Sequence, residues 1–323
     1  MPTTTTPLDD CHHPLVRDLA WVLLAPDLIA LPSCHRPTRQ ELGLADDTRL
    51  REWLADIEAN PAPLESHIGD ALVGRMGLYH ERLWQFLLNA APGTQLLAHN
   101  LRILRDRLTL GEFDLIYQKR DSDTTIHLEV AIKFYLGLPV GPRGDTDQAR
   151  WIGPGGADSL ANKREHLYQR QLRLSEQPEA RDTLRRLVHG DAGVSEEALR
   201  ITRRLAMPGV LFYPLHGAFP APHEATRDHL KGRWLHWSDW PRLRDAIAPG
   251  TQGRWLRKPH WLALPRKEWL SPLRDIEAQL AEHFTTPASP IQLALHHPTQ
   301  GWQRLFVVAD DWPRQVPLPP AGE

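Results

Sequence analysis

The 323-residue sequence predicts an α/β fold, and three observations support this prediction. Apolar side chains occupy every second position over residues 126–136, which is the period of a strand with one buried face. Residues 113–117 alternate in the same way, and the acidic turn residues 121–123 separate the two runs. Apolar residues at three-four spacing, typical of helices, precede and follow this hairpin. The sequence therefore predicts a mixed fold organised around one hairpin.

The register of the hairpin follows from its turn. A turn symmetric about residues 121–122 places Leu115 opposite Leu128, so that apolar side chains meet across the strands. The same register places Asp114 directly opposite Glu129. Two carboxylates about 5 Å apart repel one another unless a cation or a proton lies between them. We therefore expect a functional site at this pair.

Four runs of sequence resemble an uncharacterised bacterial family (domain of unknown function 1853) that is assigned to the PD-(D/E)xK nuclease superfamily. They lie within about residues 70 to 175 and read GRMGLYHERLWQFLL, GEFDLIYQKR, HLEVAIKFYLGL and WIGPGGADSLANKREHLYQRQL. The resemblance implies a restriction-endonuclease-like core of a helix, three antiparallel strands, a helix and a strand. It also implies a metal-dependent nuclease that hydrolyses the phosphodiester bonds of nucleic acid.

The resemblance also implies which residues form the site. In that superfamily an acid on one strand, and an acid and a lysine on the next, hold Mg²⁺ (or Mn²⁺) and a water molecule. The matching catalytic residues here are Asp114, Glu129 and Lys133, together with Glu81 on the preceding helix. The three acids Asp114, Glu129 and Glu81 are the implied metal ligands.

The lysine departs from the family pattern. The usual lysine lies two residues after the acid, whereas here that position is Ala131 and Lys133 lies four residues after Glu129. Four residues of strand span about 13 Å, against about 7 Å for the usual spacing. Either the lysine side chain leans back toward the metal or a residue from elsewhere replaces it. Lys163 and Gln171, on the next predicted helix, are second-tier candidates.

The remaining elements follow from periodicity and from turn residues. Helices are predicted over residues 13–24, 39–60, 68–90, 158–174, 179–188, 195–206, 241–247 and 272–284. Further strands are predicted over residues 95–104, 209–215, 233–237, 260–264 and 302–309. Before the 158–174 helix, Gly155 and Gly156 suggest either a phosphate cradle or, preferably, a surface loop capped by Asp158.

Charge is distributed unevenly along a chain whose net charge is only −2. Residues 1–66 form an acidic helical region, 67–215 a nuclease-like core, and 216–323 a basic, tryptophan-rich α+β region. Basic residues interleaved with tryptophans could bind single strands by phosphate contact and stacking, but most of these tryptophans are better explained as core residues. Nucleic acid is the expected partner, with DNA favoured over RNA.

Other classes of protein are disfavoured. With only two cysteines the chain lacks a disulfide framework, so a cytoplasmic location is expected. The longest apolar run is far too short to span a membrane, and no membrane partner is expected. A zinc site built from residues 11–13 and 34–35 is disfavoured because adjacent residues seldom ligate one tetrahedral ion.

Two alternatives to a nuclease remain. A catalytically inactive nuclease-fold protein could bind nucleic acid or a protein partner, and the displaced lysine favours this alternative. The hairpin could also be purely structural, with Lys133 or an arginine neutralising the two acids.

Overall fold

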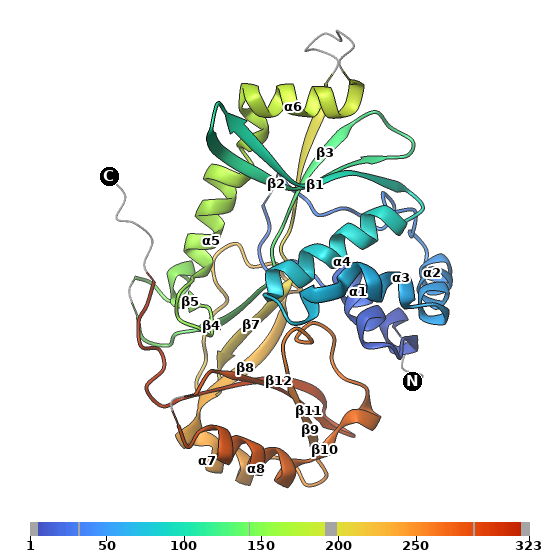
Figure 1. Cartoon of the computed structure of the whole chain (residues 1–323). Coiled ribbons are helices and arrows are strands. Elements are labelled where there is room, and N and C mark those ends of the chain that lie inside the picture. Colours follow the sequence, from blue (N-terminus) through green and yellow to red (C-terminus); the bar gives the residue numbers. More distant parts are fainter. Residues whose placement is uncertain (1–5, 32, 142, 191–198, 287, 318–323) are drawn as a thin grey trace. The chain divides into compact units, whose positions relative to one another are not determined.

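A computed structural model gives the fold and describes residues 6–31, 33–141, 143–190, 199–286 and 288–317 (Figure 1). The chain divides into two compact units. The first comprises Met1–Ile132 and Glu165–Pro208, and the second comprises Lys133–Arg164 and Gly209–Glu323. Each unit has its own β-sheet together with helices, which confirms the predicted α/β class.

Four helices begin the first unit: α1 (Pro14–Leu24), α2 (Asp47–Ala59), α3 (Ala62–Ile68) and α4 (Met76–Ala90). Helix α2 begins later than predicted because the Asp46 carboxylate caps it, accepting the Arg49 N–H at 2.9 Å. Of the single helix predicted over 68–90, residues 76–90 form α4, and the prediction is wrong only for residues 69–75. A 3₁₀ turn, Gly69–Leu72, separates α3 from α4, and Gly69 has a φ of 50°.

The first sheet has the strand order β1-β2-β3-β6. Its strands are β1 (Thr94–Arg105), β2 (Leu108–Lys119), β3 (Thr125–Val130) and β6 (Ile201–Ala206). The first three are antiparallel as predicted, and β6 is parallel to β3. Leu115 pairs with Leu128 and Tyr117 with Ile126, so the predicted register is confirmed.

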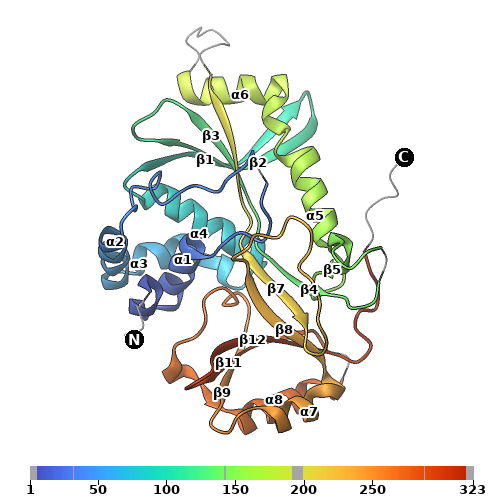
Figure 2. The same cartoon turned by 180° about the vertical axis from the view of Figure 1, so that it is seen from behind.

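Between β3 and β6 the chain first contributes two strands to the second unit, and helical segments then lead to β6. The predicted 158–174 helix is α5 (Leu160–His166), which continues into a π-helical turn, Leu167–Gln171. Helix α6 (Pro178–His189) then packs through Leu184 into a cluster with Ile103 and Phe113 of the sheet (Figure 2).

The single strand predicted over 126–136 is wrong. It is divided into β3 and β4 (Lys133–Gly137), which belong to different sheets. Strand β3 pairs with β6, whereas β4 pairs with β7 (Gly209–Pro214). The apolar alternation continues through both strands because both are buried. The side-chain pattern therefore gives no sign that the neighbouring strand changes from β6 to β7.

The helix predicted over 195–206 is also wrong for the part of this segment that the structure describes. Residues 195–198 lie outside the described residues, and Ile201–Ala206 forms strand β6. Pairing with the buried strand β3 outweighs the helical spacing of this segment. The strand predicted over 209–215 is present as β7, but it belongs to the second sheet, so β6 completes the first.

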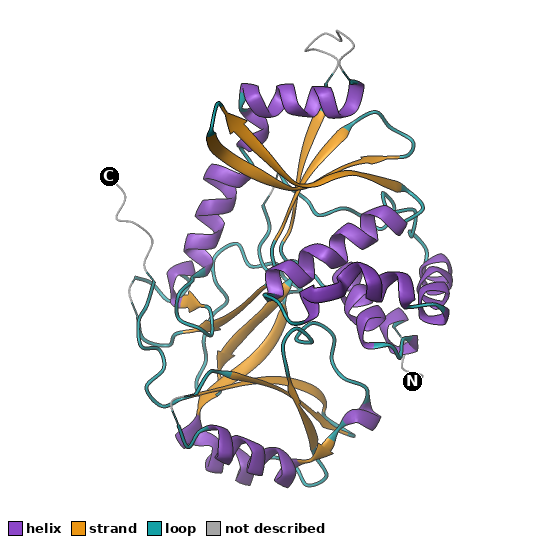
Figure 3. Ribbon diagram, in the orientation of Figure 1, coloured by secondary structure: helices purple, strands orange, loops and turns teal. Residues whose placement is uncertain are grey.

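The second sheet has the order β10-β9-β11-β12-β8-β7-β4-β5. Figure 3 shows the strands of both units in orange and the helices in purple. The strands not yet described are β5 (Trp151–Ile152), β8 (Leu230–His236), β9 (Gln252–Leu256), β10 (Ser271–Pro272), β11 (Ile291–His297) and β12 (Gly301–Val308). Helices α7 (Trp240–Ala246) and α8 (Leu273–His283) pack on it, burying Leu243 and Ile276 against Leu293 and Leu305.

The strand predicted over 260–264 is wrong. These residues form a loop in which Trp261 is buried against Phe134 and Phe306. The Trp261 carbonyl accepts hydrogen bonds from Gln292 and Arg304, so side chains rather than a neighbouring strand satisfy this backbone. Within the described ranges, no helix combines the length and apolarity needed to cross a membrane.

Candidate functional site

A buried pair of polar residues lies at the centre of the first sheet. His127 and Glu129 alternate along β3, so their side chains share one face, and both are fully buried. His127 Nε2 lies 2.7 Å from Glu129 Oε1. Other side chains pack around the pair: the Phe113 ring lies edge-on to the His127 ring, with centroids 4.5 Å apart.

The histidine of this pair is neutral. Burial lowers the pKa of His127 to about 3, although the nearby Asp114 carboxylate acts in the opposite direction. A neutral ring that donates from Nε2 to Glu129 keeps its lone pair on Nδ1. Nδ1 is buried and has no hydrogen-bond partner within the described part of the chain. The imidazole therefore acts as a neutral donor to the carboxylate.

Gln171 is the second donor to Glu129. Its Nε2 lies 2.5 Å from Glu129 Oε2. Gln171 is the last residue of the π-helical turn that follows α5, and such turns change the direction in which side chains point. The structure thus brings together Glu129 and one of the second-tier residues predicted from the sequence.

Asp114 lies on β2, one residue before the Leu115–Leu128 pair. Its Oδ2 accepts the Val130 backbone N–H at 3.0 Å, so the carboxylate is fixed at the end of β3, next to Glu129 in sequence. Asp114 is half-buried. The two acids predicted to oppose one another therefore both act at this end of the β2–β3 ladder.

Glu81 lies on α4 and contacts the edge strand β1. Its Oε2 is 3.5 Å from Asn100 Nδ2, and Asn100 also lies 3.3 Å from Glu112 Oε1. In the ranges that the structure describes, no group of three or more His, Cys, Asp or Glu side chains is arranged to hold a metal ion. Any metal site here would therefore rest on the two acids of β2 and β3.

Lys133 begins β4 in the second unit and is bound by Asp158. The two side chains are 2.5 Å apart, Nζ to Oδ2, and the Tyr135 hydroxyl donates to the same oxygen at 3.2 Å. Burial, followed by the charge of Asp158, raises the Tyr135 pKa well above its usual value. The sequence predicts Asp158 only as a helix cap, and the local spacing gives no signal that Asp158 is the partner of the lysine.

The cap of α5 is Ser159, whose Oγ accepts the Asn162 N–H at 3.2 Å. The preferred interpretation of Asp158 as a cap is therefore wrong. Lys163 lies in the first turn of this helix, where its backbone N–H bonds the Ser159 carbonyl at 3.0 Å. In the preceding loop, the Gly156 N–H donates to the Gly153 carbonyl, so one amide of the possible phosphate cradle is already used.

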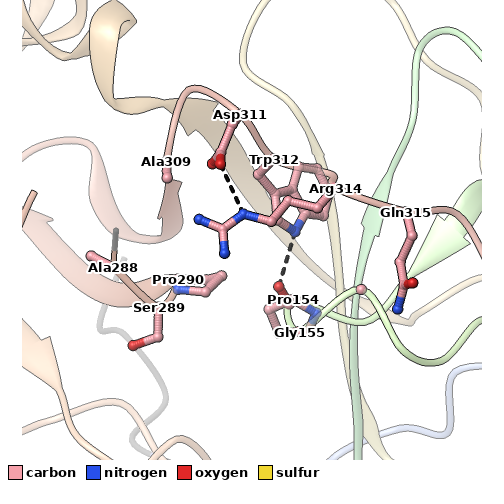
Figure 4. A pocket seen from close by; sticks show the side chains of 11 residues that line it. Pro154, Gly155, Ala288, Ser289, Pro290, Ala309, Asp311, Trp312, Arg314 and Gln315 are labelled. Atoms are coloured by element: carbon pink, nitrogen blue, oxygen red, sulfur yellow. Dashed lines mark hydrogen bonds and ion pairs between the residues drawn. The ribbon is translucent and has the colours of Figure 1, made fainter. Parts of the chain in front are cut away.

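Gly155 and Gly156 line a pocket of about 550 Å³ in the second unit (Figure 4). Arg314 extends into this pocket, and Asp311 pairs with it at 2.8 Å. Trp312 Nε1 donates to the Pro154 carbonyl at 2.9 Å and closes one side. Because Asp311 matches the charge of Arg314, the pocket has little net attraction for a phosphate.

Comparison with known proteins gives one match. A family model described as "Domain of unknown function (DUF1853)" matches residues 17–308, which is nearly the whole chain. Neither the curated proteins nor the solved structures contain a match.

Proposed function

The chain belongs to the DUF1853 family, and we propose that it is a metal-dependent nuclease with a PD-(D/E)xK core, acting on nucleic acid with DNA favoured over RNA. The first unit supports this proposal through its order of elements, apart from the inserted strands β4 and β5 of the second unit: α4, the antiparallel strands β1 to β3, helical segments, and β6 parallel to β3. That is the order implied by the resemblance to restriction endonucleases.

The observation that carries the proposal is the placement of two carboxylates at one end of the β2–β3 ladder. Asp114 is fixed there by the Val130 N–H, and Glu129 by His127 and Gln171. Carboxylate oxygens are the ligands that Mg²⁺ prefers. An ionised carboxylate has about four lone-pair positions, so these hydrogen bonds are compatible with metal ligation. Hydrogen bonds of this kind orient ligating carboxylates.

A bound cation would also supply the chemistry of the reaction. Glu129 is fully buried, so a cation at this carboxylate would be shielded from solvent. A bound Mg²⁺ or Mn²⁺ would supply positive charge, and it would polarise a phosphate and lower the pKa of a bound water.

One observation favours a second candidate function. The ammonium of Lys133 is held by Asp158, so the lysine implied by the resemblance already has a carboxylate partner. A nuclease-like protein that binds nucleic acid or another protein without cleaving it would have this feature.

A cleavage assay tests the proposal and separates the two candidates. Single- and double-stranded DNA and RNA are incubated with the wild type, Asp114→Asn, Glu129→Gln and the control Glu112→Gln, with Mg²⁺ or Mn²⁺. Glu112 is a suitable control because it lies on the same strand as Asp114 and pairs with the exposed Arg102. We expect the first two variants to lose at least about 100-fold in rate and the control to match the wild type. Binding without cleavage by the wild type would support the second candidate instead.

A further inference from the structure

A basic segment of the second unit lies outside the acidic site. Residues 254–269 begin in β9 and end just before β10, and they contain five Lys or Arg, one Glu and three Trp. We call this segment the basic tryptophan loop. Its net positive charge contrasts with the chain as a whole, whose formal net charge is −2.

Three cations of this loop lie over tryptophan rings. The cation-to-centroid pairs are Arg257 over Trp255 at 4.2 Å, Lys258 over Trp261 at 4.7 Å and Arg254 over Trp269 at 5.7 Å. All three cations are exposed to solvent. Stacking on an aromatic face fixes the position of a cation without neutralising its charge.

These three charges are not matched by acids. Arg254, Arg257 and Lys258 form no ion pair with any carboxylate in the described part of the chain. Arg266 in the same loop differs, because it pairs with Glu268. Three positive charges within five positions of sequence therefore face solvent, and an anionic ligand could contact them without first displacing an internal carboxylate.

The loop is also held in place. Trp261 Nε1 donates to the Leu256 carbonyl at 2.7 Å, and the buried Arg304 donates to the Trp261 carbonyl at 2.9 Å. Arg254 Nη1 bonds the Trp269 carbonyl at 2.8 Å and joins the two ends of the segment. A surface that is ordered before binding loses less conformational entropy when a ligand binds.

We propose that the basic tryptophan loop binds single-stranded nucleic acid. Backbone phosphates contact Arg254, Arg257 and Lys258, and a base stacks on the half-buried ring of Trp269. Many polyanions could bind three positive charges, and we name nucleic acid as the ligand because of the proposed function. The binding surface itself rests on the unmatched charges and on the ordered tryptophans.

The test uses the full-length chain and a fluorescent oligothymidylate in EDTA, with binding measured by anisotropy across a range of salt concentrations. The variant Arg254→Gln/Arg257→Gln/Lys258→Gln should bind at least about tenfold more weakly than the wild type at 0.1 M salt. Its slope of log affinity against log salt should be smaller in magnitude by about 2, since each phosphate contact on a single strand contributes about 0.7.

A matched control removes three other exposed arginines of the same unit: Arg227→Gln/Arg242→Gln/Arg274→Gln. This control changes the net charge equally and should bind like the wild type. Equal weakening of both triple variants, or no weakening of the first, would overturn the proposal. Tighter binding of the wild type to phosphatidylglycerol vesicles than to the oligonucleotide would also overturn it, because the loop would then recognise lipid phosphates.

The outcome is separable from that of the proposed nuclease activity. Because binding to the loop is measured in EDTA, it does not depend on a metal bound at Asp114 and Glu129. If the wild type binds through the loop but cleaves nothing, the proposed function fails and the loop assignment stands. If the wild type cleaves and the loop variant binds normally, the loop assignment fails and the proposed function stands.

Discussion

Gln171 Nε2 donates a hydrogen bond to Glu129 Oε2 over 2.5 Å, joining residues 42 positions apart in sequence. Removing the amide with Gln171→Ala leaves a buried carboxylate oxygen with one donor fewer. We expect the free energy of unfolding to fall by about 1–3 kcal/mol, measured by urea denaturation. The control is Gln169→Ala, two residues away in the same turn and exposed, which should change stability by less than about 0.5 kcal/mol. Equal stability of the two variants would contradict the assigned contact.

Buried neutral histidines make the fold sensitive to acid. The folded-state pKa of His127 is about 3, below its usual value of 6.5, because the ring is buried. Between these two pH values the unfolded chain binds a proton that the folded chain does not, so stability falls as pH falls. The slope from one such histidine is at most about 1.4 kcal/mol per pH unit. His80, whose pKa is also lowered to about 3 by burial, contributes in the same direction.

The contribution of His127 can be isolated by substitution. In urea unfolding between pH 6 and pH 4, His127→Asn should lose stability less steeply than the wild type, by up to about 1.4 kcal/mol per pH unit. His216→Asn, at an exposed position, should keep the wild-type slope. A His127→Asn slope equal to that of the wild type would show that the ring is already charged in the folded protein.

The Lys133–Asp158 ion pair should be measurable by a double-mutant cycle. Its partners have side chains that are 28% and 35% exposed, so solvent weakens their attraction. We expect a coupling energy of about 1 kcal/mol between Lys133→Ala and Asp158→Ala in urea unfolding. Asp158→Ala alone should lose more stability than Lys133→Ala, because it also removes the acceptor of the buried Tyr135 hydroxyl. A coupling energy near zero would show that the pair does not persist in solution.

A close backbone approach in the first unit gives a further test of the fold. A Cβ atom on Gly93 would lie 2.3 Å from the Glu41 carbonyl oxygen and 2.6 Å from the Gly43 nitrogen. Gly93→Ala must therefore displace backbone, and we expect a loss of at least about 2 kcal/mol in thermal or urea unfolding. Gly77→Ala meets nothing within 4 Å and should lose no stability. Equal stability of the two variants would show that residues 41–43 do not pack against Gly93.

The sequence was sufficient to predict the structure of segments that are determined by side-chain periodicity and by turn residues. The alternation around Leu115 and Leu128 predicted both strands and their register, because a shift of one residue would have buried charged side chains. It did not predict that Lys133 begins a strand of a second sheet, because apolar alternation is the same on both sides of residues 131–132 while the neighbouring strand changes. Partners joined only by tertiary packing, such as Lys133 with Asp158, leave no periodic signal in the sequence.

Within the site, the sequence identified the residues but not how they are connected. Glu129 and Gln171 were both candidates, yet their contact depends on a π-helical turn that helical spacing does not specify. His127 shares a face of β3 with Glu129, but its role as a buried neutral donor depends on the side chains that pack around it, such as Phe113. Such packing belongs to the tertiary structure and leaves no local signal in the sequence.

Binding of a divalent ion by Asp114 and Glu129 is the central claim, and calorimetric titration with Mn²⁺ tests it most directly. The wild type and the control Glu112→Gln should each bind the ion with the same affinity. Asp114→Asn and Glu129→Gln should lose that binding, with circular dichroism spectra unchanged. Absence of Mn²⁺ binding by the wild type at millimolar concentration, or equal binding by Glu129→Gln, would contradict the claim.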